Sequence, residues 1–230
     1  MNKYTSVSPV VRLVPEMKIF ELIEADYSLL SIFDRLDIVL PFGDMSIREL
    51  CHRDGYSDHL FLELCRMHVD LNYRPAVEQL TEDMLPQLLR YLRASHHYYE
   101  GYLLPHTMMH LDEVLAHCDE LSQLTLRRFY TDYVDFVRNH LNEEERDVFA
   151  IIEQSKLPED DLESLQMPHG DIDDRTSDIA SLIIKYLPEQ APIKLRYAML
   201  KDIYVLRDDL RRHANVELYL LKPLVDRFIR

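Results

Sequence analysis

Two histidine–glutamate pairs with identical spacing are the residues of this chain whose types and positions best suit chemistry. His140 and Glu144 stand four apart in the run HLNEEERDVF, and His213 and Glu217 stand four apart in HANVELYLL. On a helix this spacing puts both side chains of a pair on one face, one turn apart. Two imidazoles and two carboxylates from two helices form a ligand set for two metal ions inside a helical bundle. We interpret them as metal ligands; the alternative is two solvated surface pairs.

The composition favours helices and excludes several classes of function. The chain has 230 residues, only 4 glycines and a formal net charge of −15. No run of alternating apolar and polar residues is long enough to demand a sheet. We expect neither nucleic acid nor an anionic membrane as a partner, since phosphate binding requires positive charge. The motifs of a serine nucleophile and of a glycine-rich phosphate loop are missing as well.

The cysteines and the apolar segments favour a soluble, cytoplasmic protein. The N-terminal run MNKYTSVSPVVRLVPEM lacks the uninterrupted apolar region of a secretory signal. No apolar stretch approaches the ~20 residues that a membrane-spanning helix needs. Cys51, Cys65 and Cys118 are scattered and form no CxxC motif, which fits a reducing compartment. A homodimer is one assembly compatible with this sequence.

Helical periodicity divides the chain into two parts, residues 1–75 and residues 80–230. In the first part, apolar residues recur at helical spacing from Met17 to Leu36. Ser46 opens a capping-box pattern, and Ser57 is placed to cap the next helix. We therefore expect a small N-terminal domain of short helices.

The second part contains four long helical stretches. Pro105 lies inside the first of them and predicts a kink. Short connections join the first stretch to the second and the third to the fourth, which implies antiparallel neighbours. The predicted fold is all-α, with the N-terminal domain followed by an up-down-up-down four-helix bundle. The four stretches span about residues 82–118, 122–155, 169–186 and 192–228.

Distances along these helices place one histidine of each at the same depth. About 22 residues separate His97 from the first turn, and about 20 separate that turn from His140. His169 and His213 lie about 20 and 22 residues from the second turn. At 1.5 Å per residue these lengths agree within roughly 3 Å. The predicted metal ligands are therefore His97, His140, Glu144, His169, His213 and Glu217.

The chemistry of this set suits two iron ions. Neutral imidazole nitrogens suit iron, and carboxylates can bridge two hard cations while offsetting their charge. Four terminal histidines and two bridging glutamates leave room for an oxo or hydroxo bridge and an open position. Manganese or a mixed pair would use the same ligands. Asp173 is a candidate further ligand or orienting partner, and a tyrosine of the cluster around Tyr98 is a candidate hydrogen-bond donor to a metal-bound ligand.

This region resembles a hemerythrin-like domain, and the two-part layout resembles the iron–sulfur cluster repair di-iron protein family. The resemblance rests on HHYYEGYLLP, in which His97 precedes Pro105 by eight, on the two His-x-x-x-Glu pairs, on His169 opening a helix, and on LYLLKPL after Glu217. The spacing to Pro105 favours His97 over His96. The resemblance covers about residues 80–230 and extends more faintly into LLSIFDRLDIVLPFGDMSIREL.

The resemblance implies a cytoplasmic non-haem di-iron protein that responds to nitrosative or oxidative stress. It would help restore damaged iron–sulfur proteins by binding nitric oxide or by releasing iron. The family usually has a Cys-Cys pair in the turn of the N-terminal domain, and this chain has none there. Two alternatives follow. One is a sensor or carrier of dioxygen or nitric oxide without repair activity, and the other is a di-iron enzyme that reduces nitric oxide or peroxide.

Overall fold

The computed structural model describes residues 13–154, 170–187 and 189–229, and the statements below concern these residues. Their regular secondary structure is helical, apart from one isolated antiparallel bridge between Lys18 and Ser46. The predicted all-α class is therefore confirmed. In the described part of the chain, no helix combines the length and apolarity needed to cross a membrane.

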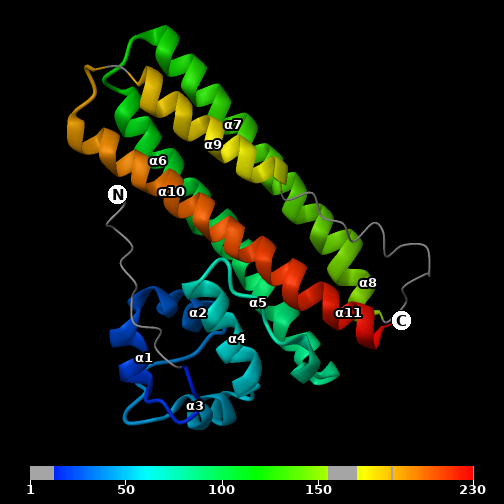
Figure 1. The fold of residues 1–230 in the computed structure, drawn as a ribbon. Coiled ribbons are helices and arrows are strands. Elements are labelled where there is room, and N and C mark those ends of the chain that lie inside the picture. Colours follow the sequence, from blue (N-terminus) through cyan, green and yellow to red (C-terminus); the bar gives the residue numbers. More distant parts are fainter. Residues whose placement is uncertain (1–12, 155–169, 188, 230) are drawn as a thin grey trace, which may run out of the picture.

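Four short helices form the N-terminal part, drawn in blue and cyan in Figure 1. They are α1 (Ile19–Ala25), α2 (Leu30–Arg35), α3 (Ile47–Asp54) and α4 (Asp58–Val69).

The capping serines predicted from the sequence begin two of these helices. The Ser46 side chain accepts a hydrogen bond from the backbone N–H of Glu49, whose carboxylate in turn accepts from the Ser46 N–H. Ser57 accepts from the backbone N–H of Leu60 at the start of α4. Asp26 separates α1 from α2, because its backbone is extended and its side chain accepts a hydrogen bond from Ser28. The periodic run therefore forms two helices.

Four long helical stretches follow, and each contains at least one α-helix of twelve residues or more. Their described ends lie within about three residues of the predicted ones. The helices are α5 (Leu85–Tyr98) and α6 (Leu104–Leu115) in the first, α7 (Glu120–Glu143) and α8 (Ala150–Glu153) in the second, α9 (Gly170–Tyr186) in the third, and α10 (Ile193–Val216) and α11 (Lys222–Phe228) in the fourth.

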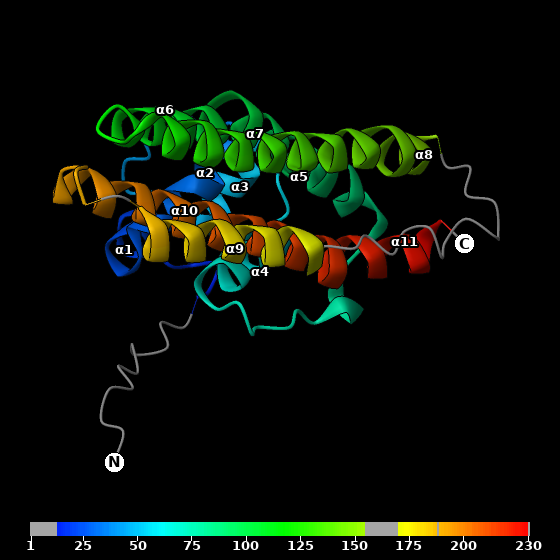
Figure 2. The ribbon, with the colours of Figure 1, turned by 90° about the horizontal axis from the view of Figure 1, so that it is seen from above.

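These stretches close into a ring. Helix α6 packs on α7, α7 on α9, α9 on α10, and α10 on α6. Figures 1 and 2 show them side by side, with the turns α6–α7 and α9–α10 at the same end. Consecutive helices of each pair therefore run in opposite directions. We refer to this arrangement as the four-helix ring.

Three of the four stretches contain a π-helical segment. The segments are Tyr99–Leu103, Glu144–Phe149 and Glu217–Leu221. The first and third are followed by Pro105 and Pro223 at the start of the next α-helix. A proline cannot donate to the carbonyl four residues earlier and its ring clashes with that carbonyl, so the widened π turn lets each helix continue. At Pro105, where the sequence predicts a kink, the structure has such a π-helical segment.

Buried polar side chains divide the apolar core of the ring into two clusters. One core cluster includes Leu92 of α5, and the other begins again at Tyr99. Between them lie the buried side chains of Ser95 and His96. The same break occurs in the second stretch at Glu144, between Leu141 and Val148, and in the fourth at His213, between Leu210 and Val216. A polar layer thus crosses an otherwise apolar interior.

The N-terminal helices share a core with one end of the ring. The cluster that contains α1–α4 side chains also contains residues of α5, α8 and α11. A buried ion pair between Arg35 of α2 and Asp209 of α10 joins the two parts. Arg212 and Asn215 of α10 donate to the carbonyl oxygens of His68 and Leu71, both at 3.0 Å. The N-terminal part is therefore fixed against the helix that carries His213.

Candidate metal centre

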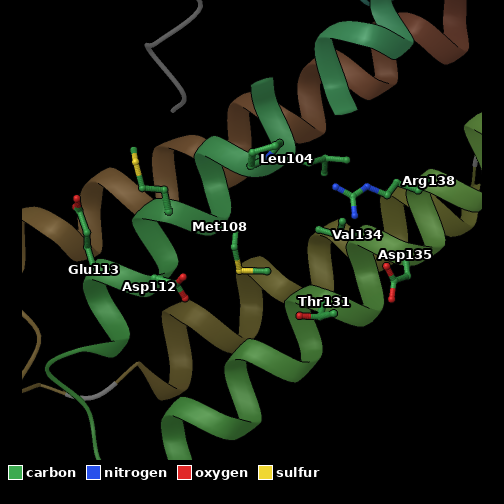
Figure 3. A pocket seen from close by; sticks show the side chains of 10 residues that line it. Leu104, Met108, Asp112, Glu113, Thr131, Val134, Asp135 and Arg138 are labelled. Atoms are coloured by element: carbon green, nitrogen blue, oxygen red, sulfur yellow. The ribbon is translucent and has the colours of Figure 1, made fainter. Parts of the chain in front are cut away.

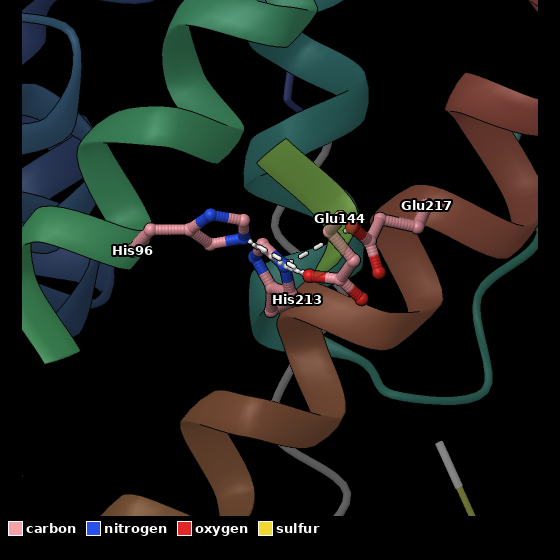
Figure 4. Close-up of side chains that lie close together, drawn as sticks. All are labelled: His96, Glu144, His213 and Glu217. Carbon is pink, nitrogen blue, oxygen red and sulfur yellow. Dashed lines mark hydrogen bonds and ion pairs between the residues drawn. The ribbon is translucent and has the colours of Figure 1, made fainter. Parts of the chain in front are cut away.

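The polar layer brings four metal-ligating side chains together from three helical stretches. His96, Glu144, His213 and Glu217 each offer one donor atom, and these atoms lie within 4.8 Å of one another. Their side chains converge in Figure 4, where His96 faces His213 and Glu144. Each residue is no more than 3% exposed. Burying so many ionisable groups is costly unless they are paired or bind a cation.

The distances between donor atoms fit ligands of one metal ion. Nε2 of His96 lies 3.1 Å from Nε2 of His213 and 3.2 Å from Oε2 of Glu144. His213 Nε2 lies 3.8 Å from the same Glu144 oxygen and 3.2 Å from Oε1 of Glu217. Donors held about 2.1 Å from one ion are separated by roughly 3.0–3.5 Å at right-angled or tetrahedral positions. The side chains present therefore fit a bound metal with little movement.

His140 contacts Glu144 as well. Its Nε2 lies 2.6 Å from Oε1 of Glu144, one turn along the same stretch. The two oxygens of Glu144 thus face different imidazoles, Oε1 facing His140 and Oε2 facing His96. A carboxylate in this position can connect two metal ions.

Partners outside the cluster fix the orientation of His96. Its Nδ1–H donates to Oε1 of Glu145 at 3.0 Å, and its ring stacks on Phe149. Arg93 donates to the other Glu145 oxygen at 2.9 Å. Burial alone would raise the pKa of Glu145, but the hydrogen bonds from His96 and Arg93 outweigh burial and lower it. The proton on Nδ1 leaves the Nε2 lone pair of His96 free to bind a metal, as in carboxylate–histidine–metal triads.

The two carboxylates set the protonation of His213. Burial alone lowers the pKa of its imidazole, but Glu217 and Glu144 outweigh burial and raise that pKa to about 10. The ring also packs edge-on against Tyr99, with centroids 5.7 Å apart. Without a metal, His213 is therefore an imidazolium between two glutamates. A bound metal ion would take the place of that proton and offset the charge of the same carboxylates.

The structure places the predicted ligands as follows. His140, Glu144, His213 and Glu217 meet in the polar layer. His97, which we predicted as a ligand, is exposed. The adjacent His96 lies in the cluster instead. His169 and the side chain of Asp173 lie outside the described residues.

The choice between the two adjacent histidines failed because the helix is irregular. The prediction of His97 rests on its spacing to Pro105. The π-helical segment Tyr99–Leu103 lies between these two residues and changes the number of residues per turn. The buried residues on the N-terminal side of the pair indicate His96 instead. His96 follows Leu92 by four and Leu89 by seven, and both leucines are buried.

Glu145 is a further residue of the site that the sequence did not single out. It stands in the run EEE, which is typical of a solvated helix face. Its role depends on the 3.0 Å contact with His96 and the 2.9 Å contact with Arg93, both from α5. Only the packing of α5 against the second stretch produces these contacts.

A cavity of about 600 Å³ lies elsewhere in the ring, between α6 and α7 (Figure 3). Met108 and Asp112 of α6 face Val134 and Arg138 of α7 across it. The four clustered residues do not line it. We therefore treat the polar layer as the candidate functional site.

Comparison with known proteins leaves the chain without an assigned family. No family model, no curated protein and no solved structure matches it. The described residues establish that buried histidine and glutamate side chains could hold a metal ion.

Proposed function

We propose that the polar layer is a carboxylate-bridged di-iron centre in a hemerythrin-like, up-down-up-down four-helix bundle. We further propose that the chain acts in the repair of iron–sulfur clusters damaged by nitrosative or oxidative stress. The observation that carries the di-iron proposal is the position of Glu144. Its two oxygens contact different imidazoles, Oε1 at 2.6 Å from His140 and Oε2 at 3.2 Å from His96.

The surrounding donors divide between two metal positions. His96 and His213 serve one, together with Oε2 of Glu144, because their Nε2 atoms lie 3.1 Å apart. His140 serves the other with Oε1 of Glu144. Glu217 is the second carboxylate, and His169 remains the further ligand we propose from the sequence.

The donor set favours iron over manganese. Imidazole nitrogens suit iron, copper, nickel and zinc, whereas manganese prefers an oxygen-rich site. His96, His140 and His213 supply three imidazoles against the two carboxylates of Glu144 and Glu217. Bound iron would supply electrons and an open coordination position to a small ligand. The chain itself excludes bulk water from that position, since the four clustered residues are at most 3% exposed.

Magnetic coupling tests the bridge directly. Metal-free protein is loaded anaerobically with ferrous iron and examined by Mössbauer spectroscopy in a strong field before and after oxidation. Two irons that share Glu144 are expected to be coupled, with a diamagnetic ground state after oxidation. Isolated, uncoupled irons would overturn the bridged arrangement. The variant Glu144→Gln should lose the coupled signal, whereas Glu143→Gln, one residue earlier and exposed, should keep it.

A sensor or carrier of nitric oxide or dioxygen is the second candidate function. Repair through thiols is not supported by the cysteines of the N-terminal part. Burial raises the pKa of the Cys51 thiol to about 12 and also raises that of Cys65. Such thiols remain protonated and unreactive at neutral pH.

A mixed assay separates the candidate functions. A damaged iron–sulfur enzyme is incubated with the iron-loaded protein, and recovery of its activity is measured. Recovery that depends on His96 and Glu144 supports repair. A stable, reversible complex with nitric oxide or dioxygen, without recovery, supports the carrier. Consumption of many equivalents of nitric oxide per chain supports the reductase and contradicts both other candidates.

A further inference from the structure

A second group of metal-binding side chains lies on the ring, away from the polar layer. His106 and His110 of α6 and Asp202 of α10 each offer a donor atom, and these atoms lie within 4.8 Å of one another. The two imidazole rings have centroids 4.5 Å apart. His110 Nδ1 contacts Oδ2 of Asp202 across the interface between the two helices.

Packing holds these side chains in place. His106 and His110 are one turn apart on the same face of α6, where i, i+4 histidines can bind one ion. The ring of Tyr102 stacks on His106 at 5.3 Å with an interplanar angle of 11°. Asp202 reaches the pair because α10 packs against α6. Two helices and an aromatic ring therefore position the donors before any ion binds.

The second group is more exposed to solvent than the polar layer. The side chains of His110 and Asp202 are 24% and 19% exposed, so water can reach the donors. His106 follows His96 by ten residues, which corresponds to a separation on the order of 15 Å along the helix. The two groups are too far apart to share an ion, because bridged metals lie about 4 Å apart.

We propose that His106, His110 and Asp202 bind one divalent transition-metal ion, with water completing its coordination. Two imidazoles and a carboxylate suit Zn²⁺ and its neighbours Ni²⁺ and Cu²⁺, and three protein ligands plus water give the four-coordinate arrangement of an open zinc site. Donors about 2.0–2.2 Å from one ion lie within roughly 4 Å of one another, so side-chain movements below about 1 Å close the site. The ion is bound at the surface of the ring and exchanges with solvent.

Zinc stoichiometry tests the proposal on the full chain. Protein stripped with a chelator is titrated with ZnCl₂ by calorimetry, then desalted for elemental analysis. The double variant His106→Ala/His110→Ala is expected to bind one zinc ion fewer than the unmodified chain. Asp202→Asn should weaken binding of that ion by about tenfold or more, because it replaces a charged ligand of the ion with a neutral amide. His117→Ala is the matched control, an exposed histidine just beyond α6 that should change nothing.

The same titration separates this site from the buried one. Glu144→Gln should keep the zinc ion that the double variant loses, whether or not the polar layer binds metal. Circular dichroism of each variant establishes that it is folded. Equal zinc stoichiometry and affinity in the unmodified chain and the folded double variant would overturn the second site. Loss of the ion in Glu144→Gln but not in the double variant would also contradict it.

Discussion

Nε2 of His140 lies 2.6 Å from Oε1 of Glu144, one helical turn further along the chain. The other oxygen of Glu144 lies 3.2 Å from His96, which comes from a different helix. Glu144 is therefore the central carboxylate of the polar layer, and it begins a π-helical segment. Such segments occur often at functional sites because they shift side chains out of regular helical phase.

Replacing each of the three consecutive glutamates of the run EEE in turn allows a matched comparison of metal binding. Glu144→Gln should remove most of the bound metal, since it replaces the proposed bridging carboxylate with a neutral amide. Glu145→Gln should weaken metal binding about ten- to a hundredfold, because Glu145 orients His96 without occupying the cluster. Glu143→Gln should bind like the unmodified chain, since Glu143 is exposed. Metal titrations of the three variants check this order, and full metal content in Glu144→Gln would contradict it.

The adjacent histidines of α5 offer a second matched comparison. His96 is buried among the donors, while His97 is exposed. His96→Ala should lose metal and with it the thermal stability that bound metal confers on the folded state. His97→Ala should retain both. Elemental analysis and thermal unfolding of the two variants distinguish them, and loss of metal in His97→Ala alone would identify His97 as the ligand and contradict this prediction.

Metal affinity should rise with pH. The pKa of His213 is raised to about 10, so below that pH a metal must displace its proton. Competition with one proton gives roughly a tenfold gain in affinity per pH unit. Calorimetry in buffers of different ionisation enthalpy should detect at least one released proton at neutral pH. An affinity that is constant between about pH 6 and pH 8, with no proton release, would contradict this protonation state.

The raised pKa of His213 also affects the stability of the metal-free protein, which should fall as the pH rises. A histidine whose folded-state pKa lies above its unfolded value of about 6.5 stabilises the folded state fully below that pH. This contribution is lost as the pH rises through about 10. Unfolding of metal-free protein in denaturant between these pH values measures it. His213→Gln should flatten this part of the pH dependence.

The buried ion pair between Arg35 and Asp209 should contribute strongly to the docking of the N-terminal helices. Its side chains are 2% and 9% exposed, and Arg35 also lies over the ring of Tyr98. Arg35→Met leaves Asp209 charged and unpaired, which should reduce the free energy of unfolding by about 3–5 kcal/mol. The double variant Arg35→Met/Asp209→Leu should recover part of this loss, because no charge remains unpaired.

Denaturant unfolding checks this prediction. Arg128→Ala, which breaks an exposed pair with Asp132, serves as the control and should leave the free energy of unfolding almost unchanged. A similarly small effect of Arg35→Met would show that the ion pair does not hold the two parts together.

Local sequence rules predicted the helices well, because helix caps and apolar periodicity depend on residues that are close together in the sequence. Ser46 and Ser57 cap the helices expected of them, and the long stretches end near their predicted bounds. The break at Asp26 was missed, because a side chain that bonds its own backbone two residues on competes with the helix. Apolar periodicity alone carries no sign of that competition.

The candidate site could be predicted where its candidate ligands belong to one helical stretch. The pairs His140/Glu144 and His213/Glu217 follow from i, i+4 spacing alone. His96 was missed because the π-helical segment Tyr99–Leu103 upset the count from Pro105. The contacts of His96 with Glu144 and His213 join different helical stretches. Spacing within one helix cannot predict such contacts, because they depend on how the helices pack.

Iron content, measured together with the absorption spectrum, tests the central claim most directly. The chain is purified, reconstituted anaerobically with ferrous iron, desalted, analysed for metals, and then oxidised for near-ultraviolet and visible spectroscopy. A di-iron centre predicts about two irons per chain and ligand-to-metal charge-transfer bands of an iron(III) pair. The variant Glu144→Gln should lose both. An absence of bound transition metal after reconstitution would contradict the account and leave the buried histidines and glutamates as a polar layer that holds the helices together.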